Sequence, residues 1–329
     1  MRNLITDVSG LNVGHADDAK LASGVTAIVF DEPATASYDL RGGAPGTRDT
    51  ELLAPEETVE RIDSIVLSGG SAFGLDAPGG AQAWLREQGR GFAVGNVRIP
   101  IVPGAILFDL LNGGDKNWGR FPPYRDLGYT AAANAAGDFK LGTAGAGYGA
   151  TTVNLKGGVG SASAQTRDGA TVGAIVAVNA VGSVVIGDGP HFWATPFEQN
   201  GEFGGLGLPP IPPGDALGLR FKGRPRENTV IALVATDATL TKPQAKRLAV
   251  MAHDGLARSV YPAHTPMDGD IVFAASTGKR PPENAIYGLA DLGALAANVL
   301  ARAIARGIYE AKALPFPGAL PSWKDKFGR

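Results

Sequence analysis

The feature that most constrains this chain is an abrupt change of character at residue 229. Residues 196–228 form a stretch rich in Pro and Gly, with no helical or strand period. Segments this long and irregular are uncommon inside a compact domain and are usually functional. From Thr229 the chain continues as TVIALVATDA, an apolar, β-branched run typical of a buried strand. Any fold must therefore join a long irregular segment directly to a core strand.

Size and composition narrow the class of protein. The 329 residues can bury a substantial core as one large domain or two ordinary ones. The net charge of −2 provides no field of one sign, which argues against nucleic acid or a membrane as partner. The absence of cysteine excludes disulfides, thiolate metal sites and a cysteine nucleophile. Without a long apolar stretch or a signal peptide, we expect a cytoplasmic protein.

No metal or cofactor is expected. The four histidines, at positions 15, 191, 253 and 264, lack the spacing of a metal site. GAGYGA (145–150) matches a loose dinucleotide-binding pattern, but the β-branched, Gly-rich residues after it do not open the helix which that pattern requires. Similarly, SGGSAFG (68–74) lacks the second glycine of a serine-hydrolase elbow. The backbone N–H groups of Gly69 and Gly70 are instead candidates for binding a substrate oxygen.

Periodicity predicts a mixture of strands and helices. Residues 24–31 and 64–70 read as buried strands, and 71–89 as a helix capped by Ser71. Residues 170–188 read as two strands that turn near Asn179.

The C-terminal third has sharper signals. The capping box Thr241-Lys-Pro-Gln predicts a helix to about residue 260. A strand is predicted at 270–277 and a long helix, buried on more than one face, at 284–311. The elements lack a regular βαβ rhythm, which indicates layered sheets covered by helices.

The Asn228–Thr229 junction has a chemical interpretation. A threonine hydroxyl is a poor nucleophile unless a base activates it. A free α-amino group on the same residue has a pKa of about 7.7–8 and is able to take that proton. Such a site requires cleavage before Thr229, with the preceding segment presenting the Asn228 carbonyl. The alternative is that a strand simply begins here.

Four other residues are candidates for the same site. Asp268 and Asp270 stand at i and i+2 before a strand and so face the same way. Asn179 is a candidate oxyanion donor, and Lys156 a cation that holds carboxylates or stabilises charge. Each also has a structural interpretation: a solvated Asp-Gly-Asp turn, a hairpin asparagine and a surface lysine.

In these residues the chain resembles the L-aminopeptidase/D-amidase family, self-processing hydrolases that include β-aminopeptidases and the nylon-oligomer hydrolase. The resemblance spans nearly the whole chain, and so many segments in one order make it specific. The segments are VGHADD (13–18), RGGAPGTRDTELL (41–53), LSGGSAFGLDAPGG (67–80), IPIVPGAILFDL (99–110), GTAGAGYGAT (142–151), KGGVGSAS (156–163), NTVIALVATDATLTKPQAKRLA (228–249) and HTPMDGDIVFAASTG (264–278).

The resemblance implies an α/β fold, an αββα sandwich similar to N-terminal-nucleophile hydrolases, formed by a single catalytic domain over 1–329. It implies self-cleavage into chains 1–228 and 229–329 that stay associated, often as a tetramer of cleaved heterodimers. It also implies that Thr229 is the nucleophile, that Asp268 and Asp270 orient it, that Asn179 holds the oxyanion and that Lys156 balances the carboxylates.

The branches of the family differ at a few positions. Aminopeptidases typically start the small chain with Ser and carry Ser-x-Glu, whereas this chain has Asn-Thr and Asp-Gly-Asp, as the nylon-oligomer hydrolase does. Phe108, a substrate-binding candidate, stands where some relatives place a tyrosine. The expected substrate is a small amide or peptide. The alternatives are an aminopeptidase for L-, D- or β-amino acid amides, an acyltransferase of the ornithine acetyltransferase type and a non-catalytic assembly protein.

Overall fold

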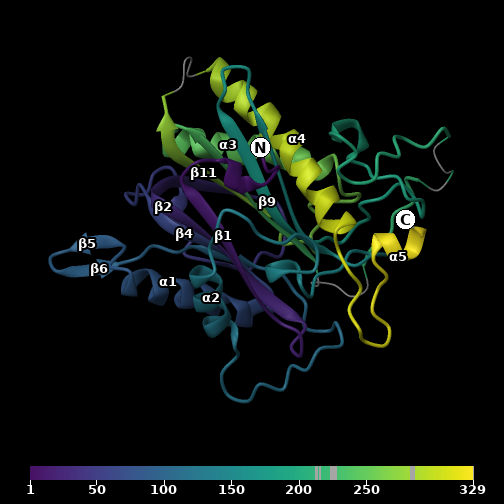
Figure 1. Ribbon diagram of the computed structural model, residues 1–329, viewed down its shortest axis with the longest axis horizontal. Helices are drawn as coiled ribbons and strands as arrows, with labels where there is room; N and C mark the ends of the chain where they lie inside the picture. The colour runs from purple at the N-terminus through teal and green to yellow at the C-terminus, as the bar shows by residue number, and fades with distance from the viewer. Residues whose placement is uncertain (212–213, 215, 223–227, 282–285, 329) are drawn as a thin grey trace.

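The computed structural model describes residues 1–211, 214, 216–222, 228–281 and 286–328. Two sheets are stacked and joined by the long strand β2 (Ser23–Leu40), with helices on both outer sides (Figure 1). The N-terminal half of β2 pairs with β1 and β4, and its C-terminal half pairs with β11. The two layers are therefore continuous through one bent strand.

The first sheet also contains β1 (Leu11–Asp18), β3 (Thr47–Arg48), β4 (Ile62–Ser68) and β7 (Gly104–Ile106). The second contains β8 (Gly158–Gln165), β9 (Thr171–Asn179), β10 (Thr229–Ala238) and β11 (Ile271–Arg280). A separate hairpin of β5 (Phe92–Val94) and β6 (Val97–Ile99) projects from the body of the molecule (Figure 1).

Helices α1 (Ala77–Glu87) and α2 (Tyr124–Ala133) pack on the first sheet, and α3 (Lys242–Ala257) and α4 (Tyr287–Tyr309) on the second. A short α5 (Trp323–Phe327) follows. Single 3-10 turns lie at Ile5–Asp7, Glu51–Leu53, Gly145–Gly147 and Thr195–Phe197, and a longer one at Ser71–Asp76. The order of layers is helix, sheet, sheet, helix, which confirms the predicted αββα sandwich.

Strand β10 shows why this order is stable. Its even-numbered residues, such as Val230 and Ala232, face the helices α3 and α4, while Ile231 and Leu233 face the first sheet. Successive side chains of a strand point to opposite faces, so an apolar run without alternation fits a strand covered on both sides. Thr229 stands two residues before Ile231 in the strand, so its side chain lies on the same face, which points between the two sheets.

Most predicted elements are confirmed, with two corrections. The Thr241 capping box begins α3 as expected, and the helix of 284–311 is found as α4, although residues 284 and 285 lie outside the described residues. Ser71 does not cap a helix: residues 71–76 form a 3-10 turn, and the α-helix begins at Ala77 with Pro78 in its first turn, where proline is tolerated.

The predicted hairpin at 170–188 is wrong. Strand β9 ends at Asn179, and its partners are β8 and β10 instead of the residues that follow it. Residues 180–187 are buried and form only isolated bridges, from Ser183 to Tyr261 and from Val185 to Phe192. The apolar character of this segment reflects burial and not a second strand.

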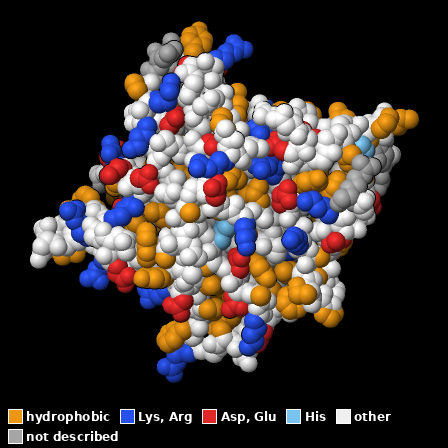
Figure 2. Space-filling view, viewed as in Figure 1, with side chains coloured by type: hydrophobic (Ala, Val, Ile, Leu, Met, Phe, Trp, Pro, Cys, Tyr) orange, Lys and Arg blue, Asp and Glu red, His pale blue; other side chains and the backbone are white. Residues whose placement is uncertain are grey.

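Helix α4 is apolar enough, by length and mean hydropathy, to cross a membrane. However, it packs against β8, β9 and α3, and 61% of its most apolar window is buried inside the protein. This burial is typical of the core helix of a globular domain. Acidic and basic side chains are interspersed over the face of the molecule in Figure 2, in keeping with the small net charge.

A buried ion pair ties the segment after residue 195 to α4. Glu202 accepts hydrogen bonds from the Arg302 guanidinium, and these side chains are 7% and 2% exposed. We expect Glu202→Gln to lower the free energy of unfolding by about 3 kcal/mol, because a buried charge loses its partner. Thermal denaturation measures this, with Asp138→Asn as control, since its pair with Arg2 is largely exposed and worth less than about 1 kcal/mol. Equal melting temperatures for the two variants would contradict the prediction.

Candidate active site

Thr229 begins β10 between two strands that supply the rest of the site. Its backbone is paired with Asn179, the last residue of β9, and Asn228 forms a bridge with Asp268, just before β11. The predicted residues Thr229, Asn179, Asp268 and Asp270 therefore meet at one end of the second sheet, although they are up to 91 residues apart in the sequence. All four are at least 95% buried.

The carbonyl of Asn228 lies between the threonine hydroxyl and a backbone donor. Thr229 Oγ1 is in hydrogen-bond contact with Asn228 O, and Gly269 donates its N–H to the same oxygen at 3.0 Å. A donor aimed at a carbonyl oxygen stabilises the negative charge that develops there during nucleophilic attack. The carbonyl oxygen of the peptide bond before Thr229 thus has both a neighbouring hydroxyl and a backbone N–H donor.

The side chain of Asn228 is enclosed at the junction. It is buried, and neither its amide oxygen nor its amide nitrogen has a partner among the residues that the structure describes. Leaving buried polar atoms unsatisfied costs about 1–3 kcal/mol. This residue is therefore held at the junction by the surrounding chain at an energetic cost.

Asp270 anchors the start of β10, and Asp268 anchors the turn beside it. Asp270 Oδ1 accepts the N–H of Val230 at 2.8 Å, and Asp268 Oδ2 accepts the N–H of Thr265 at 2.8 Å. Residues 41–44 hold this turn from the other side: Ala44 donates its N–H to Asp268 O, and Arg41 donates to Asp270 O. The Asp-Gly-Asp segment is thus a buried turn with fixed geometry and not a solvated one.

The two carboxylates differ in their surroundings. Burial, and then the negative charge of Asp270, raises the pKa of Asp268 to about 6. An acid whose pKa lies close to neutrality is suited to accept and return protons. The pair therefore combines one carboxylate that anchors the strand with one that is able to act as a general base.

The Asn179 side chain is oriented by contacts at both ends. Its Oδ1 accepts hydrogen bonds from the Thr151 N–H at 3.0 Å and from Lys222 Nζ at 2.7 Å. Its Nδ2 donates to the carbonyl of Phe108 at 3.1 Å. The amide donor therefore faces away from Lys222, which fixes the direction in which Asn179 offers its N–H groups.

Lys156 is buried, but its contacts differ from the expected ones. Its Nζ donates to three backbone carbonyls, those of Gly147, Ala150 and Gly157, at 2.8–3.0 Å. Burial lowers its pKa to about 7, which the negative charge of Asp109 partly opposes. Lys156 thus braces the chain around 147–157, and any effect on Asp268 or Asp270 acts through space.

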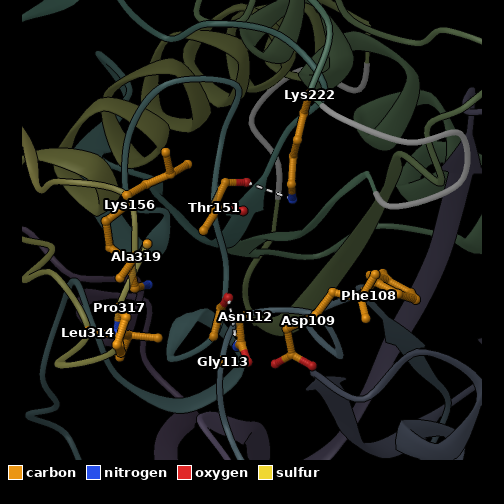
Figure 3. A pocket seen from close by; sticks show the side chains of 14 residues that line it. Phe108, Asp109, Asn112, Gly113, Thr151, Lys156, Lys222, Leu314, Pro317 and Ala319 are labelled. Atoms are coloured by element: carbon orange, nitrogen blue, oxygen red, sulfur yellow. Dashed lines mark hydrogen bonds between the residues drawn. The ribbon is translucent and has the colours of Figure 1, made fainter.

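A pocket of about 320 Å³ is lined in part by hydrogen-bond partners of Asn179 (Figure 3). Phe108 and Asp109, from the segment after β7, lie on one side of the pocket, and the C-terminal segment lies on the other side together with Lys156 (Figure 3). Lys222 reaches in beside Thr151, to whose carbonyl it donates at 3.1 Å. The lining residues are Phe108, Asp109, Leu111, Asn112, Gly113, Gly149, Thr151, Lys156, Lys222, Leu314, Pro317, Gly318, Ala319 and Leu320. Three of them, Phe108, Thr151 and Lys222, form hydrogen bonds with Asn179, which links the pocket to the junction.

Gly69 and Gly70 pack against Asp109, which lines the pocket. Gly69 donates its N–H to Gly24 O at 2.9 Å, and Gly70 donates to Asp109 Oδ1 at 2.8 Å. A Cβ on Gly70 would lie 2.1 Å from the Tyr124 ring, so only glycine fits there. In the continuous chain both N–H groups serve the protein's own structure, and these glycines shape the pocket wall through Asp109.

Three functional candidates escape analysis of the sequence. Gly269 contributes only its backbone N–H, a group that every residue except proline carries. His264 contacts Asp270, and Lys222 contacts Asn179. Only the folded chain brings these residues together, so no sequence pattern marks them. The position of Gly269 between two candidate aspartates is the one signal that pointed to it.

The fold is a layered αββα sandwich with a buried threonine hydroxyl at the start of β10, and comparison with known proteins identifies the family. The model for peptidase family S58 matches residues 3–318. A Mycobacterium tuberculosis protein described as an uncharacterized aminopeptidase is 43% identical, over 99% of this chain and 98% of its own length. A 6-aminohexanoate-oligomer endohydrolase from Kocuria is 26% identical, over 82% of this chain and 74% of its own.

Among solved structures, the L-aminopeptidase D-Ala-esterase/amidase of Ochrobactrum anthropi superposes with a TM-score of 0.71 at 21% identity. The match covers 99% of this chain and 92% of that one, whose fold is described as a variant of the Ntn hydrolase fold. The chain belongs to peptidase family S58, which confirms the predicted family and fold. It is therefore a hydrolase of peptide or amide bonds.

Proposed function

We propose that this protein is a self-processing amide hydrolase with Thr229 as its N-terminal nucleophile. The observation that carries the proposal is the arrangement at the junction: the Thr229 hydroxyl contacts the Asn228 carbonyl oxygen, and the Gly269 N–H is bonded to that same oxygen. A nucleophile and an oxyanion donor on one peptide bond are the two groups that acyl transfer requires.

Self-cleavage would proceed in two steps. Thr229 Oγ attacks the carbonyl carbon of Asn228 and gives up its proton, and the peptide C–N bond breaks as the nitrogen of Thr229 takes up a proton. The resulting ester then reacts with water, which leaves a carboxylate on Asn228 and a free α-amine on Thr229. That amine becomes the base for later rounds, in which Thr229 attacks a substrate amide.

In the uncut chain the nitrogen of Thr229 is an amide and cannot act as a base. We infer that Asp268 takes the hydroxyl proton in this first reaction. Its backbone bridges to Asn228 at the junction, its side chain is buried, and burial raises its pKa to about 6. Asp270 holds the peptide unit after the nucleophile, and Asn179 is the second oxyanion donor in turnover.

The pH dependence of self-cleavage tests the role of Asp268. A general base works only when ionised, so the first-order rate should fall about tenfold per pH unit below about 6 and level off above it. Freshly purified uncut protein, sampled over time between about pH 5 and pH 8, provides these rates. Asp268→Asn should abolish the dependence along with most of the cleavage, whereas Asp138→Asn should leave both unchanged. A rate independent of pH across this range would exclude Asp268 as the base.

Two relatives suggest a class of substrate but differ in the acyl group. The mycobacterial relative supports an aminopeptidase and the Kocuria relative supports the hydrolysis of 6-aminohexanoate oligomers. We propose small linear amides or peptides as substrates, and the processed protein should be assayed on peptide p-nitroanilides, β-peptides and 6-aminohexanoate oligomers. Turnover of none of these, by protein with a free Thr229 N-terminus, would reject the proposed activity. Turnover only with an amine acceptor would support the acyltransferase instead.

A further inference from the structure

His264 lies on the far side of Asp270 from the nucleophile. Both of its hydrogen-bond donors are directed at the same carboxylate oxygen: its backbone N–H meets Asp270 Oδ2 at 3.1 Å, and Nδ1 meets it at 2.9 Å. The other oxygen of Asp270 accepts the N–H of Val230, the residue after Thr229. The carboxylate therefore links His264 to the peptide unit that follows the nucleophile.

The backbone of His264 is held in a strained conformation. Its φ is +57°, in the left-handed region that costs a non-glycine residue roughly 1–2 kcal/mol. This conformation accompanies the double contact of N–H and Nδ1 with one oxygen. Strain that persists beside a candidate site is a reason to ask what the strained residue does there.

The hydrogen bonds of the His264 ring favour a positioning role over proton transfer to or from Thr229. An ionised carboxylate only accepts hydrogen bonds, so Nδ1 carries the proton that it donates to Asp270. The remaining nitrogen, Nε2, is buried and has no partner in the part of the chain that the structure describes. His264 thus contacts the carboxylate and not the Thr229 hydroxyl, whose contact is with Asn228 O.

A second histidine keeps the ring in place. His253 of α3 packs against His264 edge-on, with ring centroids 4.9 Å apart and an interplanar angle of 73°. Its own Nε2 donates to the carbonyl of Asp39 at 2.9 Å, and burial lowers its pKa to about 4, so it is neutral. Arg41 and Lys246 occupy the Asp39 carboxylate. The charge that His264 faces is therefore that of Asp270.

We propose that His264 is a positioning residue, which orients the Asp270 carboxylate and through the Val230 N–H fixes the start of β10 for attack by Thr229. This inference rests on the proposed function. Without the histidine donor, one oxygen of Asp270 retains only a backbone contact, the carboxylate is free to rotate, and the nucleophile loses its alignment. Misplacement of reacting groups by a fraction of an ångström lowers the rate and not the affinity for substrate.

The test compares side chains that all tolerate a left-handed backbone. His264→Asn keeps a side-chain N–H donor. His264→Asp has the shape of the Asn variant but presents an acceptor to Asp270. His264→Gly removes the side chain. Self-cleavage of the Asp and Gly variants should be slowed at least about tenfold, and that of the Asn variant within about threefold of the parent. In processed protein, kcat should fall by similar factors with KM unchanged. Asn200→Gly, at an exposed position with φ of +54°, is the control for backbone relief.

Three outcomes would overturn this role: normal cleavage by the Gly variant, equal impairment of the Asn and Asp variants, or a change in KM alone. The melting temperature shows whether the Asp and Gly variants fold. If one of them does not, the cleavage rate of the other, compared with that of the Asn variant, still tests the role of His264. Thr229→Ala is run in parallel. Cleavage of that variant would reject the proposed function itself, whereas an uncut Thr229→Ala beside a normal His264→Gly would reject only the role of His264.

Discussion

Thr229→Ala should remain a single polypeptide of 33.7 kDa, while the parent separates into chains of 228 and 101 residues. Removing the Oγ leaves no atom to attack the Asn228 carbonyl, although Gly269 still donates to its oxygen. Amidase activity should fall about 10⁴-fold or more, the usual loss when a nucleophile is removed. Denaturing electrophoresis and intact mass measure the cleavage, and N-terminal sequencing of the small chain identifies Thr229.

Thr229→Ser is the matched control for this substitution. Serine keeps the attacking oxygen at the same place on the strand, so cleavage should continue, more slowly, because the methyl group that restricts the χ1 rotamer is lost. Thr229→Ala should also melt close to the uncut parent, since it removes one buried hydroxyl and one methyl group. Two fragments from Thr229→Ala, or a Thr229→Ser variant as intact as the alanine variant, would show that another residue is the nucleophile.

The sequence predicts the parts of the site that carry a chemical signal. Thr229 stands at an abrupt strand start, and Asp268 and Asp270 stand two residues apart before another strand. Their meeting follows from the order of strands, since β10 lies between β9 and β11. The layered fold is equally visible, because strands that are apolar on both faces require cover on both sides.

What the sequence does not reveal depends on contacts between distant segments. Lys156 looks like a partner for carboxylates, yet the loop around it offers three carbonyls first. His264 appears as one of four scattered histidines until its left-handed backbone turns two donors toward Asp270. The false hairpin at 170–188 has the same origin, since apolar runs do not distinguish a buried connection from a strand.

Gly269→Ala should strongly slow self-cleavage, because the added methyl group displaces either the Thr229 hydroxyl or the 268–270 turn. A Cβ at this position would lie 2.8 Å from Thr229 Oγ1, 2.9 Å from Ala44 O and 3.2 Å from the Cα of Pro45. Contacts below 3.0 Å to carbon are not tolerated, so the hydroxyl or the 268–270 turn has to move. The backbone of Gly269 is not left-handed, so alanine suffers no conformational penalty there, and the effect is purely one of space.

The displacement acts on both requirements of acyl transfer at once. The added methyl group pushes the nucleophile from the Asn228 carbonyl, and any shift of the turn lengthens the Gly269 N–H contact of 3.0 Å. We expect cleavage to slow at least about 10²-fold, the loss typical of a nucleophile or oxyanion donor displaced by about an ångström. Gly288→Ala in α4, where a Cβ meets nothing within 4 Å, is the control. If Gly269→Ala cleaves as fast as this control, the hydroxyl does not attack from beside Gly269, and the oxyanion must be held elsewhere.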